Sequence, residues 1–219
     1  MQNKNRTVYV VKAALLGVLA FVLELLEISL PIFPSFLKLD FSLIFPLLGS
    51  FALGPVAGVL IELVKNFLHF ITIGIGSTAG VGDLANFLVG SALVLTAGGI
   101  YARNKTRRTA ILGLICGVFA MIVTGAIVNA FITLPFYATA FFAEAGGMDA
   151  IVKMCAAIIP AIHNRFTVIL FTFCPFNLLK GVVLTAVTIP VYKYISPLLK
   201  AESFNKSNSR SRKAKESKT

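Results

Sequence analysis

An asparagine and a lysine lie three residues apart in an otherwise apolar stretch, 166–191. They are Asn177 and Lys180 in "CPFNLLKG". Residues at this spacing share one face of a helix. A lysine at the centre of a membrane helix costs about 2.5 kcal/mol or more, so some partner must hold it there. The amide can donate and accept hydrogen bonds and the ammonium only donates, which together could bind a polar ligand edge.

Other polar residues are predicted to gather at the same end of the membrane segments. Asn129 occurs in "IVNAFITLPFY", Asp83 and Asn86 open "GVGDLANFLVG", and Lys38 and Asp40 come from the segment 30–42. Polar residues within membrane segments usually face the bundle interior or a cavity. Their number favours a water-accessible binding cavity, although each group could instead satisfy a neighbouring helix for about 0.6 kcal/mol.

Aromatic residues close to these polar groups would suit a flat, largely apolar ligand. Aromatic residues are also common at any membrane interface, so the pattern alone does not decide between the two explanations. The residues concerned are Phe33, Phe36, Phe41, Phe136, Tyr137 and Phe176.

A second polar face is predicted in "IELVKNFLHF". Glu62, Lys65, Asn66 and His69 follow helical spacing there, so they form one continuous face. We interpret Glu62 and Lys65 as an internal ion pair, with a ligand role as the alternative. His69 is interpreted as a core residue and not as a metal ligand. Glu24 and Glu27, near the outer end of the first helix, are expected to face the outer water layer.

The composition indicates an integral membrane protein. Of the 219 residues 57% are hydrophobic and 13% charged, whereas about 25% of the residues of soluble domains are charged. A span needs about 20 apolar residues. We therefore predict an all-α membrane protein, a six-transmembrane-helix bundle forming a single domain over 1–199, with a basic disordered cytoplasmic tail over 200–219. The predicted helices are 9–29, 42–53, 55–73, 81–101, 109–136 and 166–192, with a short surface helix within 148–163.

The distribution of basic residues predicts the orientation. They gather near the N-terminus, around 103–108 and in the C-terminal tail, whereas the segments between these groups hold only Lys38, Lys153 and Arg165 outside the spans. Cytoplasmic loops carry the excess of Lys and Arg, so both termini are expected in the cytoplasm. We interpret the net charge of +11 as orientation signals and contacts with the lipid bilayer, and not as a nucleic-acid surface. The three cysteines lack metal-site spacing and are expected to pack.

The order of these motifs resembles one known family. The stretches "FPSFLKLDFS", "GPVAGVLIELVKNFLHF", "GDLANFLVGS", "NAFITLPFY" and "PFNLLKGVV" are together similar to the riboflavin-specific substrate-binding (S) component of energy-coupling-factor (ECF) vitamin transporters. The resemblance runs from about residue 12 to residue 199. It implies a non-enzymatic subunit without cofactors in the plasma membrane of a bacterium. Such a subunit binds riboflavin on its outer side and docks on a transmembrane coupling subunit with two ATPase subunits.

The resemblance also implies roles for particular residues. The flavin-contacting positions match Asn129, Asn177 and Lys180, and the first loop contributes Lys38, Leu39, Asp40 and Phe41. With the cavity residues named above, the predicted ligand-binding set also includes Asp83, Asn86 and Tyr137. The family docks through small residues on the first helix, for which this chain offers Ala13, Gly17 and Ala20. Small residues at this spacing let another helix approach closely.

Three other functions remain open from the residues alone. The chain could be an S component for another small vitamin. It could be an autonomous secondary transporter, although it lacks a convincing internal repeat. It could be a membrane-embedded enzyme, although it lacks G-x-S-x-G and H-E-x-x-H motifs.

Overall fold

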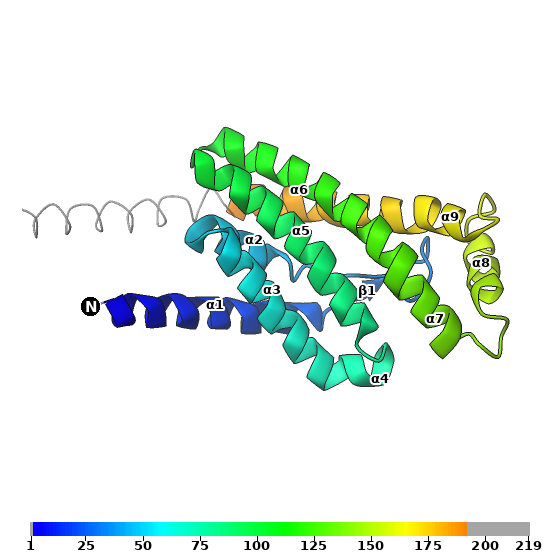
Figure 1. Cartoon of the computed structure of the whole chain (residues 1–219). Helices are drawn as coiled ribbons and strands as arrows, with labels where there is room; N and C mark the ends of the chain where they lie inside the picture. Colours follow the sequence, from blue (N-terminus) through cyan, green and yellow to red (C-terminus); the bar gives the residue numbers. More distant parts are fainter. Residues whose placement is uncertain (1, 192–219) are drawn as a thin grey trace, which may run out of the picture.

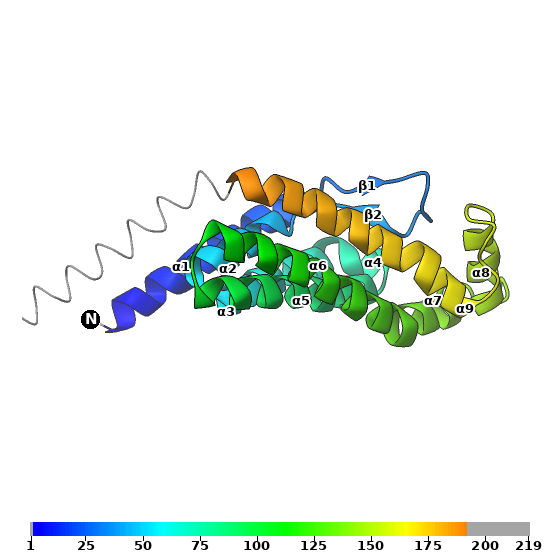
Figure 2. The same ribbon diagram turned by 90° about the horizontal axis from the view of Figure 1, so that it is seen from above.

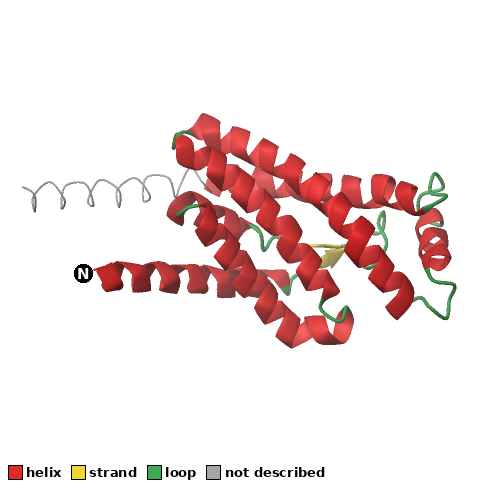
Figure 3. Cartoon of the chain, viewed as in Figure 1, coloured by secondary structure: helices red, strands yellow, loops and turns green. Residues whose placement is uncertain are grey.

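The fold is an elongated helical bundle with one short hairpin. The computed structural model describes residues 2–191 and is drawn in Figure 1. Helices make up most of this range, as Figure 3 shows. The elements are α1 (Gln2–Glu24), β1 (Ile28–Ser29), β2 (Lys38–Leu39), α2 (Ile44–Leu53), α3 (Pro55–His69), the π-helix η1 (Phe70–Gly74), α4 (Ile75–Ser77), α5 (Val81–Arg103), α6 (Arg107–Val128), the π-helix η2 (Asn129–Thr133), α7 (Leu134–Ala140), α8 (Met148–Ala156), α9 (Arg165–Val168), the π-helix η3 (Ile169–Phe173) and a helix over 174–191.

Five helical segments in residues 2–191 are long and apolar enough to cross a membrane. They are Thr7–Glu24, Pro55–Gly74, Val81–Arg103, Arg107–Ala140 and Arg165–Val191. The predicted segment 42–53 is also helical, but α2 has only 10 residues, fewer than the about 20 that an upright span needs. The described part of the chain therefore has the long apolar helices predicted for a membrane protein. The predicted tail, 200–219, lies outside the described residues.

The first helix is shorter at its C-terminal end than the sequence predicts. The prediction continued to residue 29, whereas α1 ends at Glu24 and the chain then forms a hairpin. In this hairpin Ile28 pairs with Leu39 and Ser29 with Lys38 in antiparallel register. The apolar run conceals the helix end, because its last residues suit a strand as well as a helix.

The junction between α2 and α3 is the sharp stop that "LGP" predicts. Gly54 has a φ of 107°, a conformation that favours glycine, and it joins the two helices directly. Pro55 then opens α3, where a missing N–H costs nothing.

The small residues of α1 pack against α3 of the same chain. Ala13 and Ala20 are buried, and a Cβ added at Gly17 would lie 2.6 Å from Cγ1 of Val64. The close helix approach expected at Gly17 is therefore present within the chain, with α3 as the neighbour. That Ala13, Gly17 and Ala20 form a docking surface for a coupling subunit stays a prediction.

The two ends of the bundle differ. Figure 1 places the N-terminus and the α5–α6 turn toward one end, and α4, the hairpin, α7 and α8 toward the other. Three of the long helical segments each include five residues of π-helix, namely η1, η2 and η3. Such segments are rare in proteins and occur frequently at functional sites, which directs attention to the end with the hairpin.

Candidate functional site

A cavity of about 330 Å³ lies among the hairpin, the π segments and the last helix. This volume is at the lower end of the roughly 300–1,000 Å³ of small-molecule sites. Its walls combine polar and apolar side chains from most of the elements. The lining residues are Glu24, Glu27, Phe36, Leu37, Lys38, Asp40, His69, Ile73, Thr78, Gly82, Asp83, Ala85, Asn86, Val89, Met121, Asn129, Thr133, Tyr137, Phe173, Phe176, Asn177 and Lys180.

The predicted ligand-binding residues come together around this cavity, with two exceptions. Leu39 is buried in a cluster with Phe33 and Phe176 and does not line the cavity. Phe41 is half-buried and also lies outside the lining. The eight that line it are Lys38, Asp40, Asp83, Asn86, Asn129, Tyr137, Asn177 and Lys180.

Lys180 forms a buried ion pair with Asp40. The ammonium Nζ lies 2.7 Å from Oδ2 of Asp40, and both side chains are about 6% exposed. Asp40 also accepts hydrogen bonds from the backbone N–H and the hydroxyl of Ser42. The lysine and its counter-ion shield each other from water. Asp40 is the partner that holds this lysine.

The environment of Asp40 keeps it ionised. Burial alone would raise the pKa of its carboxyl. The charges of Lys180 and Lys65, with hydrogen bonds from Lys180 and Ser42, outweigh that effect and hold this pKa well below its usual range. The stabilisation that the pair provides is therefore present above the ordinary aspartate pKa of about 3.9. It is lost only as the pH falls well below that value.

Glu62 and Lys65 form the internal ion pair that their spacing predicts. Nζ of Lys65 lies 2.8 Å from Oε1 of Glu62, with both side chains fully buried. The prediction for Glu24 is wrong. This residue is 3% exposed and lies 3.5 Å from Nζ of Lys65, so it faces the bundle interior and not the water layer.

Asp83 and Asn86 line the cavity, but each also has a partner within the chain. Oδ1 of Asp83 is hydrogen-bonded to Nδ1 of His69. Asn86 donates a 2.6 Å hydrogen bond from Nδ2 to Oε1 of Glu24. Within residues 2–191, Oδ2 of Asp83 and Nε2 of His69 have no hydrogen-bond partner. His69, predicted to be a core residue, therefore belongs to the cavity wall.

Asn129 and Asn177 are brought together at a glycine. Nδ2 of Asn129 donates to the carbonyl oxygen of Gly125 at 2.7 Å. A Cβ at Gly125 would overlap Nδ2 of Asn177, so only glycine leaves room for this amide. Thr133 lies in the same π segment as Asn129, and its buried hydroxyl has no partner in the described part of the chain. Sequence reasoning missed Thr133, although its position four residues after Asn129 was a signal.

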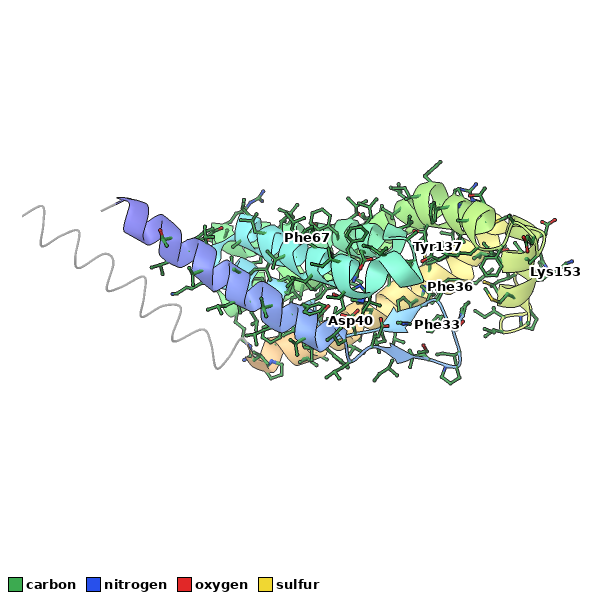
Figure 4. All side chains as sticks on the ribbon, turned by 90° about the horizontal axis from the view of Figure 1, so that it is seen from below. Phe33, Phe36, Asp40, Phe67, Tyr137 and Lys153 are labelled. Atoms are coloured by element: carbon green, nitrogen blue, oxygen red, sulfur yellow. The ribbon has the colours of Figure 1, made fainter. Side chains whose placement is uncertain are left out.

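Aromatic rings form one wall of the cavity. The Phe36 ring packs edge-on against Tyr137, with centroids 6.1 Å apart, and lies 6.0 Å from Phe173. Figure 4 shows Phe36 and Tyr137 close together, with Asp40 nearer the middle of the bundle and Lys153 at the end formed by α8. Phe33 packs on Phe176 of the last helix at 5.3 Å, and Figure 2 shows the hairpin beside that helix.

Three ion pairs lie in the lining of the cavity. Lys38 pairs with Glu27, Lys180 with Asp40 and His69 with Asp83. Each cationic side chain of the described lining is thus already in contact with a carboxylate. Such a cavity suits an uncharged ligand that combines a flat apolar ring with several hydrogen-bonding atoms.

Comparison with known proteins places these features in a family. Residues 8–192 match the family described as "ECF transporter, substrate-specific component". The chain is 33% identical over 200 residues to "Riboflavin transporter RibU" of Staphylococcus aureus (strain TCH60), covering 91% of this chain and 95% of that protein. It is 29% identical over 192 residues to "Riboflavin transporter FmnP" of Bacillus subtilis (strain 168), covering 88% and 94% respectively.

A solved structure shares the fold. It is described as "Structure and mechanism of the S component of a bacterial ECF transporter" and aligns with a TM-score of 0.67 at 33% identity, covering 91% of this chain and 99% of the other. The relatives are transport proteins and not enzymes. The chain therefore belongs to the family of substrate-specific components of ECF transporters.

Proposed function

We propose that this chain is the riboflavin-binding membrane subunit of an ECF-type importer in a bacterial plasma membrane. It captures the vitamin at the end of the bundle that carries the hairpin, which is the outer end. Six helices cross the membrane, with α2 as the short one, and both termini lie in the cytoplasm. A separate transmembrane coupling subunit and two ATPase subunits supply the energy for uptake.

The cavity is the observation that carries this proposal. Riboflavin is flat, uncharged near neutral pH and rich in hydrogen-bonding atoms. Phe36, Tyr137 and Phe173 offer an aromatic wall, while Asn129 and Asn177 offer amides that both donate and accept. Each cationic side chain of the described lining already contacts a carboxylate, which suits a neutral ligand. The names of the relatives from S. aureus and B. subtilis support riboflavin over another vitamin.

The purified subunit is expected to bind riboflavin without any nucleotide. The binding groups all belong to this chain, and ligand capture would precede the ATP-driven step. Quenching of riboflavin fluorescence in detergent, titrated with and without ATP, measures this directly. Failure to bind riboflavin, or a requirement for ATP, would contradict the proposed function.

Replacing Thr133 with valine is expected to weaken riboflavin binding by about 2- to 12-fold. That range corresponds to the loss of one hydrogen bond, about 0.5–1.5 kcal/mol. Valine keeps the shape of threonine and removes only the hydroxyl, which has no partner in the described part of the empty protein.

A matched control is Thr188→Val in the last helix. Thr188 also has a buried hydroxyl without a partner in residues 2–191, but it lies outside the cavity lining. This variant should keep the affinity of the unmodified protein. Equal affinities for all three proteins would show that Thr133 does not contact the ligand.

A further inference from the structure

Two buried glutamates share one lysine beside the cavity. Nζ of Lys65 lies 2.8 Å from Oε1 of Glu62 and 3.5 Å from Oε1 of Glu24. Lys65 and Glu62 are fully buried, and the Glu24 side chain is 4% exposed. One positive charge therefore faces two carboxylates at a site with almost no contact with water.

The surrounding charges do not correct this imbalance. Asp40 is paired with Lys180, Asp83 with His69, and Glu27 with Lys38. The other polar groups near Lys65 are neutral: Ser42 accepts a 3.1 Å hydrogen bond from its ammonium, and Asn86 donates to Glu24. Asp40 and Glu27 thus each have their own lysine, and Asp83 is hydrogen-bonded to His69, whereas Glu24 and Glu62 share a single lysine.

Three acceptor atoms at this place also lack a donor. Within residues 2–191, Oε2 of Glu24, Oε2 of Glu62 and Oδ1 of Asn66 are buried and have no hydrogen-bond partner. Asn66 belongs to the same group, because its Nδ2 donates to Oε1 of Glu62 at 3.0 Å. The amide oxygen and the oxygens of ionised glutamates accept hydrogen bonds but cannot donate them. An added proton or cation would supply what these three atoms lack.

Glu62 has little freedom to leave the site. A Cβ on Gly90 of α5 would lie 2.8 Å from Cδ of Glu62, so that helix packs directly on the carboxylate. An unpaired buried charge costs several kcal/mol, and such groups usually neutralise instead.

We propose that Glu24 and Glu62 together bind one monovalent cation, a proton or an alkali metal ion, beside Lys65. The site is distinct from the riboflavin-contacting amides, but Glu24 also lines the cavity. Occupancy of the cation site is therefore expected to influence ligand binding, and this part of the inference rests on the proposed function.

The stability of the ligand-free protein tests the site without riboflavin. If the native state holds an extra proton that the glutamate of the unfolded chain releases above about pH 4.3, the unfolding equilibrium constant should rise up to tenfold per pH unit from about pH 4.3 until the native site itself releases the proton. Stability is thus fully present at lower pH and lost as the pH rises. If an alkali ion occupies the site, replacing choline with Na⁺ or K⁺ at constant ionic strength and pH should raise the melting temperature.

Glu24→Gln and Glu62→Gln are the informative variants. Each amide mimics the protonated acid, so both proteins should fold, and each should lose the dependence on pH or on the alkali ion. Glu27→Gln is the matched control, because Glu27 is a partly exposed carboxylate one turn away that pairs with Lys38. All these variants keep His69, so any pH dependence from the His69–Asp83 pair is common to them.

Three results would overturn the inference. The first is a melting temperature of the unmodified protein that responds neither to pH in this range nor to Na⁺ or K⁺. The second is an equal loss of the response in Glu24→Gln and Glu27→Gln. Failure of both Glu24→Gln and Glu62→Gln to fold would also contradict it, since neutral side chains are what the site is inferred to accept.

Calorimetry of riboflavin binding tests the link to the cavity separately. For a proton, the binding enthalpy should differ between buffers of different ionisation enthalpy, and this difference should vanish in Glu24→Gln. For an alkali ion, the affinity should depend on Na⁺ or K⁺. Binding that is insensitive to both would remove the link but leave the cation site intact, whereas absence of binding would contradict the proposed function instead.

Discussion

Lys180→Met is expected to lower the free energy of unfolding of the ligand-free protein by about 3–5 kcal/mol, the cost of breaking a buried ion pair from one side. The substitution leaves Asp40 buried without its counter-ion, and the remaining hydrogen bonds from Ser42 do not replace a positive charge. The melting temperature in detergent, measured before any ligand is added, reports this loss. Riboflavin affinity should also fall, because both residues line the cavity.

The double variant Asp40→Asn with Lys180→Met separates charge from shape. It removes both charges, so it should recover most of the stability that the single variant loses. Lys153→Met, on the exposed side of α8, is the control for removing a lysine that is not buried. If Lys180→Met keeps the stability of the unmodified protein and loses only affinity, then Lys180 acts as a ligand group and the ion pair contributes little.

Gly17→Leu is expected to cost about 3 kcal/mol of stability and to disturb the packing of α1. A Cβ at this position would already lie 2.6 Å and 2.7 Å from side-chain atoms of Val64, and the leucine is larger still. Since Glu24 lies on the same helix and lines the cavity, riboflavin binding should weaken as well. A melting curve and a riboflavin titration on the same sample measure both effects.

Gly99→Leu provides the matched substitution in another membrane helix. A Cβ at Gly99 meets nothing within 4 Å, so the leucine has space and stability should change little. The earlier docking interpretation makes a different prediction for Gly17→Leu: normal stability and normal riboflavin binding, with loss of uptake only. That combination would show that α3 does not hold this face in the membrane.

Periodicity and composition predict the helices of this protein well, because each helix carries its own signal. The stops at Gly54 and Pro55 and the spacing of Glu62 and Lys65 are local features, and the structure confirms both. The hairpin was missed because Ile28 and Ser29 suit a strand only when Lys38 and Leu39 lie beside them.

The partners of the buried charges could not be read from the sequence. Lys180 and Asp40 are 140 residues apart, and Glu24 and Asn86 are 62 residues apart. Nothing near Glu24 in the sequence indicates that Lys65 lies beside it, so an outward-facing carboxylate was the simpler expectation. The polar residues of the cavity could be predicted as a group because membrane helices place such residues inward, but their pairing depends on the tertiary arrangement.

The span of 140 residues between Asp40 and Lys180 has a consequence for biogenesis. At about 5–20 residues per second, the ribosome needs roughly 7–28 s after Asp40 to reach Lys180. During that interval the hairpin segment has been synthesised but its counter-ion has not. The first spans must therefore insert with the carboxylate still hydrated, and the cavity closes around it only when the final span arrives. Vitamin binding by a nascent chain would thus mark the completion of its synthesis.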